Sequence, residues 1–157
     1  MTAPRRLAPL LALGLALALG ACAAPGPHGY RPDHGALNPH ETPRLRRMID
    51  HYARAYDVPP SLVHRVVQRE SRYNPRARNG PYWGLMQILP ATARTMGYRG
   101  SPRGLLDPDT NLRYGVKYLR GAWLLADGSE ARAVMWYSRG YYYEAKRRGM
   151  LHATGLD

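Results

Sequence analysis

The chain has 157 residues and one cysteine, and its 23 Lys and Arg against 11 Asp and Glu give a formal net charge of +12. One cysteine excludes a framework of internal disulfides, and the length accommodates one domain of ordinary size. An excess of positive charge is typical of proteins that bind nucleic acid. It also suits other anionic polymers, lipid headgroups or simply a solvated, arginine-rich surface.

Residues 1–21 have the features of a signal peptide. Two arginines precede an apolar run at residues 7–19, which is too short to span a bilayer comfortably. The run ends at Leu19–Cys22, which resembles the lipobox of bacterial lipoproteins. We therefore expect cleavage before Cys22 and attachment of lipid to its thiol. An ordinary signal peptide with a chance cysteine is the alternative. Either way the chain is exported, so nucleic acid is not expected as its partner.

The residues after Cys22 suggest where the chain is held. Ala23 follows, and not the Asp that often signals retention at the inner membrane, so we expect an outer-membrane anchor facing the periplasm. Residues 22–42 repeat Pro, Gly and His with almost no apolar periodicity, which predicts a flexible linker after the lipidated cysteine. The folded domain is expected at residues 43–157.

Within this domain, apolar residues recur at helical spacing, and no alternating strand pattern of useful length is present. A first helix is expected from Pro43 to the break at Val58–Pro60, and a second begins at Pro60. Further helices are predicted near 90–96, 109–126, 129–138 and 141–148. The predicted fold class is therefore all-α, in a single domain.

Glu70 falls on the apolar face of the second predicted helix. It follows three valines at helical spacing, Val63, Val66 and Val67. Burial and the negative end of the helix dipole both disfavour the charged carboxylate, because Asn74 and Pro75 stop the helix just beyond. Both effects raise the pKa and suit a general acid. The alternative is a helix-end carboxylate that turns outward to pair with Arg69 or Arg72.

Four segments occur in the order seen in one enzyme family. They read ESRYNPRA (70–77), GLMQILPATA (84–93), LDPDTNLRYGVKYL (106–119) and AVMWYSRG (133–140). Together they resemble the lytic transglycosylases of the soluble, lysozyme-like type. The resemblance implies a helical, lysozyme-like domain of the goose-type kind, with a catalytic cleft beside the helix that carries Glu70.

The resemblance also implies roles for particular residues. Glu70 matches the single catalytic carboxylate of the family, and Ser71, Gln87 and Tyr137 match residues that line the sugar groove. Ser71 equally suits a helix cap, and Tyr137 suits a core aromatic whose hydroxyl is satisfied. Gln87 lies in an apolar stretch, so its amide needs a defined partner, of which substrate is one candidate. Met86 is expected to pack in the core and to touch the sugar.

Two stretches depart from the family pattern. Ser138, followed by Arg139, stands where the family usually has Asn and a small residue, so a shorter hydrogen-bonding group is expected to meet the substrate. The aromatic residues Tyr82 and Trp83 precede Gly84, where the family has small residues. Tyr82 is a candidate for stacking on a sugar ring, and a lid over the core is the alternative.

The acids suggest chemistry with one carboxylate. A two-carboxylate glycosidase needs a second acid roughly 5–10 Å from the first. Asp107 and Asp109 are better explained as helix caps, and Asp127 as part of a turn. The resemblance then implies non-hydrolytic cleavage of the β-1,4 bond between N-acetylmuramic acid and N-acetylglucosamine in peptidoglycan, which leaves 1,6-anhydro ends.

No cofactor or metal is expected, because the six histidines lack ligand spacing. The expected partners are peptidoglycan strands and, through lipid on Cys22, the membrane, with the protein a monomer. Two alternatives remain open. One is a muramidase that hydrolyses the same bond on the same fold, and the other is a lipoprotein that binds peptidoglycan without cleaving it.

Overall fold

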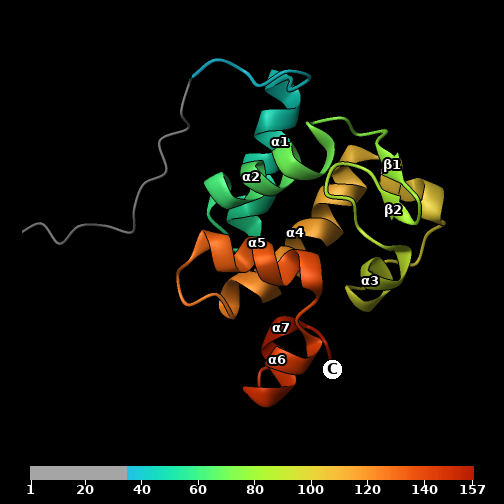
Figure 1. Ribbon diagram of the computed structural model, residues 1–157. Helices are drawn as coiled ribbons and strands as arrows, with labels where there is room; N and C mark the ends of the chain where they lie inside the picture. The colour runs from blue at the N-terminus through green and yellow to red at the C-terminus, as the bar shows by residue number, and fades with distance from the viewer. Residues whose placement is uncertain (1–34) are drawn as a thin grey trace, which may run out of the picture. The chain divides into compact units, whose positions relative to one another are not determined.

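The computed structural model describes residues 35–157. The predicted signal peptide, Cys22 and most of the predicted linker lie outside the described residues. In the part that is described, the chain forms seven α-helices, one short 3-10 helix and one two-stranded hairpin, which confirms the all-α fold class (Figure 1). No helix among these residues has both the length and the apolar character needed to cross a membrane.

The helices follow the predicted order closely. Their bounds are α1 Pro43–Ala55, α2 Pro60–Ser71, α3 Pro90–Thr95, α4 Pro108–Leu124, α5 Glu130–Arg139, α6 Tyr142–Arg147 and α7 Leu151–Thr154. The 3-10 helix spans Pro102–Leu106, and the hairpin pairs β1 (Arg78–Asn79) with β2 (Tyr82–Trp83) in antiparallel register. Helix α7, the 3-10 helix and the hairpin were not expected from the sequence, since each is too short to show a periodic pattern.

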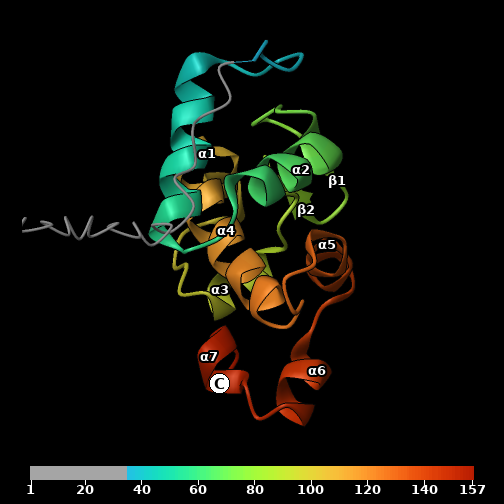
Figure 2. The ribbon, with the colours of Figure 1, turned by 90° about the vertical axis from the view of Figure 1, so that its left-hand side faces the viewer.

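Helix α4 is the centre of the domain. It packs against α1, α3, α5 and α7, and Figures 1 and 2 show it enclosed by these elements. Its buried face presents Leu112, Val116 and Leu119, none of which is exposed to solvent. The side chains of α1 and α2 complete this main core, because both helices bury the apolar stripe that their sequences predict.

A smaller core lies under the hairpin. Ile88, Ala93, Tyr98 and Leu105 form it, and Trp83 packs against it. The guanidinium carbon of Arg78 lies 4.0 Å from the centre of the Trp83 ring. Trp83 is therefore a lid on this core, as one of the two sequence interpretations proposed, while its neighbour Tyr82 is 42% exposed.

Residues 38–41, which the sequence assigns to the linker, pack onto the helices. The Glu41 carboxylate is buried and receives hydrogen bonds from Arg46 and Asn38. The Tyr73 hydroxyl lies 3.1 Å from the Asn38 amide nitrogen and 3.0 Å from His64 Nδ1. These residues thus join the segment before α1 to the turn that follows α2.

Candidate active site

The end of α2 places Glu70 at the wall of a groove. The helix stops at Ser71 because Arg72 and Tyr73 take left-handed backbone angles, with φ of 51° and 63°. The sequence predicts that Asn74 and Pro75 stop the helix, so the helix ends slightly earlier than predicted. Left-handed geometry is rare in residues other than glycine, so neither position carries a sequence signal.

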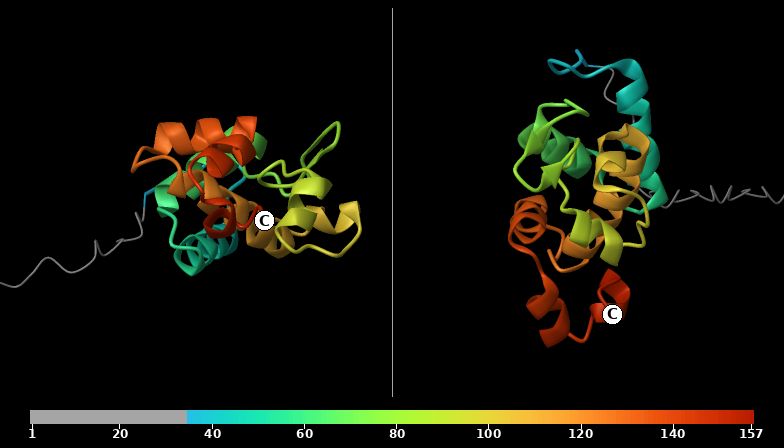
Figure 3. Two further views of the ribbon diagram at one scale, coloured as in Figure 1. Left: turned by 90° about the horizontal axis from the view of Figure 1, so that it is seen from below. Right: turned by 90° about the vertical axis from the view of Figure 1, so that its right-hand side faces the viewer.

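Around Glu70 the structure forms a hollow of about 340 Å³. Its lining residues are Arg69, Glu70, Asn79, Tyr82, Gln87, Tyr137 and Ser138. Helix α5 provides one side and the hairpin with the segment after it provides the other, and the view from below in Figure 3 shows α5 and the hairpin as separate parts of the domain. Five residues expected at the site are thereby brought together from four separate segments of the chain.

The Glu70 carboxyl is partly removed from water, with 23% of its side chain exposed. Burial raises its pKa above the ordinary value, in the direction that the sequence predicts, while the charge of Arg69 acts to lower it. Arg69 Nε lies 3.6 Å from Glu70 Oε1, so the pairing that the alternative interpretation foresaw is present. More than half of the Arg69 side chain is exposed, and solvent weakens its effect.

Gln87 is held by the main chain around it. Its Nε2 donates to the carbonyl oxygens of Gly84 at 2.8 Å and Ala77 at 3.2 Å, and its φ is 47°. The partner that its amide requires is therefore backbone. Among the described residues its Oε1 accepts no hydrogen bond, which leaves an acceptor in the lining of the hollow.

Tyr137 connects the two sides of the groove. Its hydroxyl donates to the carbonyl oxygen of Met86 at 2.8 Å, and the residue is 9% exposed. Burial, and secondly the neighbouring Glu70 carboxylate, raise its pKa well above the ordinary value of 10.0, so the hydroxyl stays protonated. Tyr137 is both a core aromatic and a groove residue, which combines the two interpretations drawn from the sequence.

Two of the expected residues do not line the hollow. The Ser71 hydroxyl donates to the carbonyl oxygen of Val67, one turn back in α2, and Ser71 does not line the hollow. Met86 is fully buried against Gly115, so its side chain is out of reach of a sugar in the groove. Its contribution to the site is the carbonyl that Tyr137 binds.

Asn111, which was not among the predicted site residues, holds the segment 83–86 through hydrogen bonds to its main chain. Its Nδ2 donates to the carbonyls of Trp83 and Leu105 at 2.9 and 2.8 Å, and its Oδ1 accepts from the Met86 N–H at 2.9 Å. Asn111 has no exposed surface. A sequence signal did exist, because this asparagine falls on the buried face of α4 one turn before Gly115.

The groove continues away from Glu70 along the end of α5. A second hollow of about 270 Å³ shares Tyr82, Gln87, Tyr137 and Ser138 with the first. It leads to a third of about 800 Å³, with which it shares Thr92, Tyr118, Arg139 and Gly140. Among the described lining residues of all three hollows, the acids are Glu70 and Glu144.

The Glu144 carboxylate is already engaged by two arginines. Glu144 is bound by Arg147 and Arg148, each with a contact of 2.6 Å. In residues 35–157, no group of three or more His, Cys, Asp or Glu side chains has a geometry that could hold a metal ion.

Comparison with known protein families gives a match over the part of the chain that forms this groove. The model of the Transglycosylase SLT domain matches residues 47–149, which is more than half of the chain. The chain belongs to the transglycosylase SLT family. The match spans Glu70, the hairpin, Gln87 and the end of α5, so the whole groove falls within the family domain.

Several curated SLT relatives are similar to this chain. The soluble lytic murein transglycosylase of Escherichia coli K12 is 35% identical over 82 residues, which are 46% of this chain and 12% of that protein. The transglycosylase of Enterobacteria phage PRD1 is 42% identical over 66 residues, 41% of this chain and 23% of the phage protein. The membrane-bound lytic murein transglycosylase C of Haemophilus influenzae PittEE is 36% identical over 86 residues, 50% of this chain and 23% of the relative.

These alignments cover less than a quarter of each relative's length. No solved structure gives a significant match to this SLT chain.

Proposed function

We propose that this SLT protein is a peptidoglycan lytic transglycosylase in which Glu70 is the only acid and base. One observation carries the proposal: the Glu70 carboxyl is partly buried and has a raised pKa. The other described residues that line the first two hollows are neutral or basic. The names of the relatives support the same activity.

The proposed reaction needs one group that first donates and then accepts a proton. Glu70 protonates the glycosidic oxygen, the bond from that oxygen to C1 of N-acetylmuramic acid breaks, and the substrate's N-acetyl group stabilises the positive charge at C1. The Glu70 carboxylate then takes the proton of the C6 hydroxyl, whose oxygen bonds to C1. The product carries a 1,6-anhydro ring, Glu70 is protonated again, and no water is consumed.

The surroundings of Glu70 suit both halves of this cycle. Burial favours the protonated acid before cleavage, and the Arg69 guanidinium stabilises the carboxylate that forms afterwards. Gln87 Oε1 and the Ser138 hydroxyl, whose proton is donated to the carbonyl oxygen of Val134 at 3.0 Å, provide hydrogen-bond acceptors in the same hollow, and the exposed ring of Tyr82 provides a face for a sugar. Ser71 and Met86 act on this site only indirectly.

The place of action is proposed from the sequence and from one relative. The Haemophilus influenzae protein is named membrane-bound, which supports a cell-envelope location. Lipid on Cys22 and an outer-membrane anchor remain proposals, since that residue lies outside the described part of the chain.

Digestion of purified sacculi tests the function, with soluble products identified by mass spectrometry. The wild-type protein is expected to release anhydro-muropeptides, and Glu70→Gln to release none. Glu130→Gln is the matched control, because Glu130 bonds to Ser61 and Arg65 outside the groove. Products heavier by one water, with ends that borohydride reduces, indicate a muramidase. Binding to sacculi without soluble products indicates a non-catalytic protein.

A further inference from the structure

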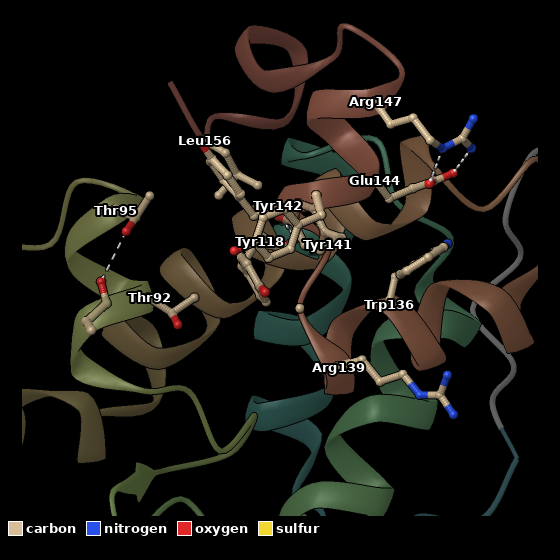
Figure 4. A pocket seen from close by; sticks show the side chains of 13 residues that line it. Thr92, Thr95, Tyr118, Trp136, Arg139, Tyr141, Tyr142, Glu144, Arg147 and Leu156 are labelled. Atoms are coloured by element: carbon tan, nitrogen blue, oxygen red, sulfur yellow. Dashed lines mark hydrogen bonds and ion pairs between the residues drawn. The ribbon is translucent and has the colours of Figure 1, made fainter.

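The third hollow, at about 800 Å³ the largest of the three, has no role in the chemistry at Glu70. We call it the α6 pocket. Helix α3 contributes Thr92 and Thr95, α4 contributes Tyr118, α5 contributes Trp136, and α6 and the C-terminal segment contribute Tyr142 and Leu156. In Figure 4 the two threonines lie on one side, Trp136 lies on the other, and Tyr118 and Tyr142 lie between them.

Among the tyrosines of residues 35–157, those most exposed to solvent line this pocket and the groove. Among residues 35–157, the large apolar side chains most exposed to solvent are Leu37, Tyr82, Tyr142 and Tyr143. Tyr82 lines the groove beside Glu70, and Tyr142 and Tyr143 line the α6 pocket, at 46% and 84% exposure. Exposed aromatic faces that gather in one connected depression are typical of a binding surface.

The polar groups of the pocket favour a neutral ligand rich in hydroxyls. Arg147 Nε and Nη2 both donate to Glu144, which Arg148 binds as well, so these charges are already paired. The Arg139 side chain extends away from Tyr118 and Tyr142 in Figure 4. The rings of Tyr118 and Tyr142 and the side chain of Thr92 line the space between the walls, while the Thr95 hydroxyl donates to the carbonyl oxygen of Ala91. A sugar ring matches this lining, because its C–H face stacks on tyrosine and its hydroxyls accept and donate hydrogen bonds.

The pocket also lies in line with the groove. It shares Thr92, Tyr118, Arg139 and Gly140 with the second hollow, which in turn shares Tyr137 and Ser138 with the hollow at Glu70. A polymer bound across Glu70 can therefore pass into it. We propose that the α6 pocket binds further sugar rings of the same glycan strand, through stacking on Tyr142 and Tyr143. This inference rests on the proposed function, since it takes the strand cut at Glu70 as the ligand.

Binding to peptide-free glycan strands tests the inference without cleavage. In a Glu70→Gln background, Tyr142→Ala combined with Tyr143→Ala is expected to raise the Kd for long strands about tenfold, which corresponds to about 1.4 kcal/mol of binding free energy. Binding of a disaccharide is expected to stay unchanged. Tyr142→Phe with Tyr143→Phe keeps both rings and should bind like the parent. Leu37→Ala is the control, because it removes an exposed apolar group outside the pocket.

Trp136 offers a second readout. Long strands are expected to change the tryptophan emission of the parent, and the change should be lost in Trp136→Phe. Equal long-strand affinity in the parent and the double alanine variant overturns the inference. So does a requirement for stem peptides with strong weakening by salt, which would assign the pocket to peptide carboxylates. Absence of sacculus digestion by the wild type overturns the proposed function but leaves this binding comparison intact.

Discussion

The Tyr137 hydroxyl and the Met86 carbonyl oxygen, 2.8 Å apart, join helix α5 to the segment that carries Gln87. Ser138 and Gln87 stand next to these two residues in the chain, and both line the hollow at Glu70. One buried hydrogen bond therefore sets the spacing of the two sides of the groove. Its loss should affect substrate binding as well as stability.

Tyr137→Phe removes this bond and leaves the Met86 carbonyl without its donor. The free energy of unfolding, measured with urea, is expected to fall by about 1–3 kcal/mol. Sacculus digestion per folded molecule should also fall. Tyr98→Phe is the control, since Tyr98 likewise donates to a carbonyl, that of Ser101 at 2.7 Å, but lies in the small core outside the groove. If the two variants lose equal activity, Tyr137 has no special role in the site.

Gly84→Ala is expected to prevent stable folding of the groove. A methyl group at this position would collide with Asn111 Nδ2 and the Leu105 carbonyl, which are already bonded to each other. Gly80→Ala is the matched control, because Gly80 also has a positive φ but has no atom near the added methyl. It should cost only about 1 kcal/mol for the left-handed backbone. Thermal unfolding of the two variants separates the effect of the collision from the effect of the backbone angle. Equal melting temperatures would contradict the predicted collision at Gly84.

The pH dependence of cleavage should follow Glu70. The reaction needs the protonated acid, so the rate is expected to fall as the pH rises through the Glu70 pKa, which burial raises and Arg69 lowers. Arg69→Gln removes the lowering influence, so the alkaline limb of the rate profile should move to higher pH. Arg103→Gln removes an equal charge from the 3-10 helix and should leave the limb in place. A shift of the Arg69→Gln limb toward lower pH would refute the ion-pair argument.

Stability should fall in mild acid because of His64. Burial lowers its pKa below 6.5, although Glu41 and Asp50, with carboxylate oxygens at 3.8 and 3.5 Å, act to raise it and Arg46 acts to lower it. The unfolded chain then binds the proton more tightly than the folded one, so this contribution to stability is complete above pH 6.5 and is lost as the pH falls toward the lowered pKa.

Urea unfolding from about pH 7.5 to about pH 5 tests the His64 prediction. The free energy of unfolding should decline more steeply in the wild type than in His64→Gln. His51→Gln, at an exposed position on α1, should keep the wild-type slope. Glu41 does not interfere in this range of pH: hydrogen bonds from Arg46 and Asn38 outweigh burial and lower its pKa from 4.5 to about 2, so its contribution to stability is lost mainly below pH 4.5. A wild-type slope in His64→Gln would contradict the assignment.

The sequence was sufficient for the parts of the fold that depend on local pattern. Helices α1, α2, α4 and α5 follow from apolar residues at helical spacing, and the valines of α2 correctly predicted that Glu70 would be partly buried. The position of Gln87 and Tyr137 in one groove came from the family resemblance, since no local pattern relates residues fifty positions apart along the chain.

Other parts depended on contacts that a single sequence does not show. Met86 lies in the core because Gly115 on α4 leaves room for it, and Gln87 finds its partners in backbone carbonyls of Ala77 and Gly84. The left-handed angles at Arg72 and Tyr73 accompany the bonds of the Tyr73 hydroxyl to His64 in α2 and to Asn38, which lies 35 residues away along the chain. Asn111 acts through three main-chain groups that only the folded chain brings together.

The packing of residues 38–41 has a mechanical consequence. A force applied to the chain from its amino-terminal side reaches the folded domain at Gly35 and Ala36, whose carbonyl oxygens accept from Arg46, and then at Asn38 and Glu41. From there it is transmitted through Arg46 to α1 and through Tyr73 to the turn after α2. The hairpin and α5, which form the two sides of the groove, make none of these contacts. Tension on the chain is thus borne by α1 and by the turn that follows Glu70, and α5 and the hairpin can keep their positions while the protein is held.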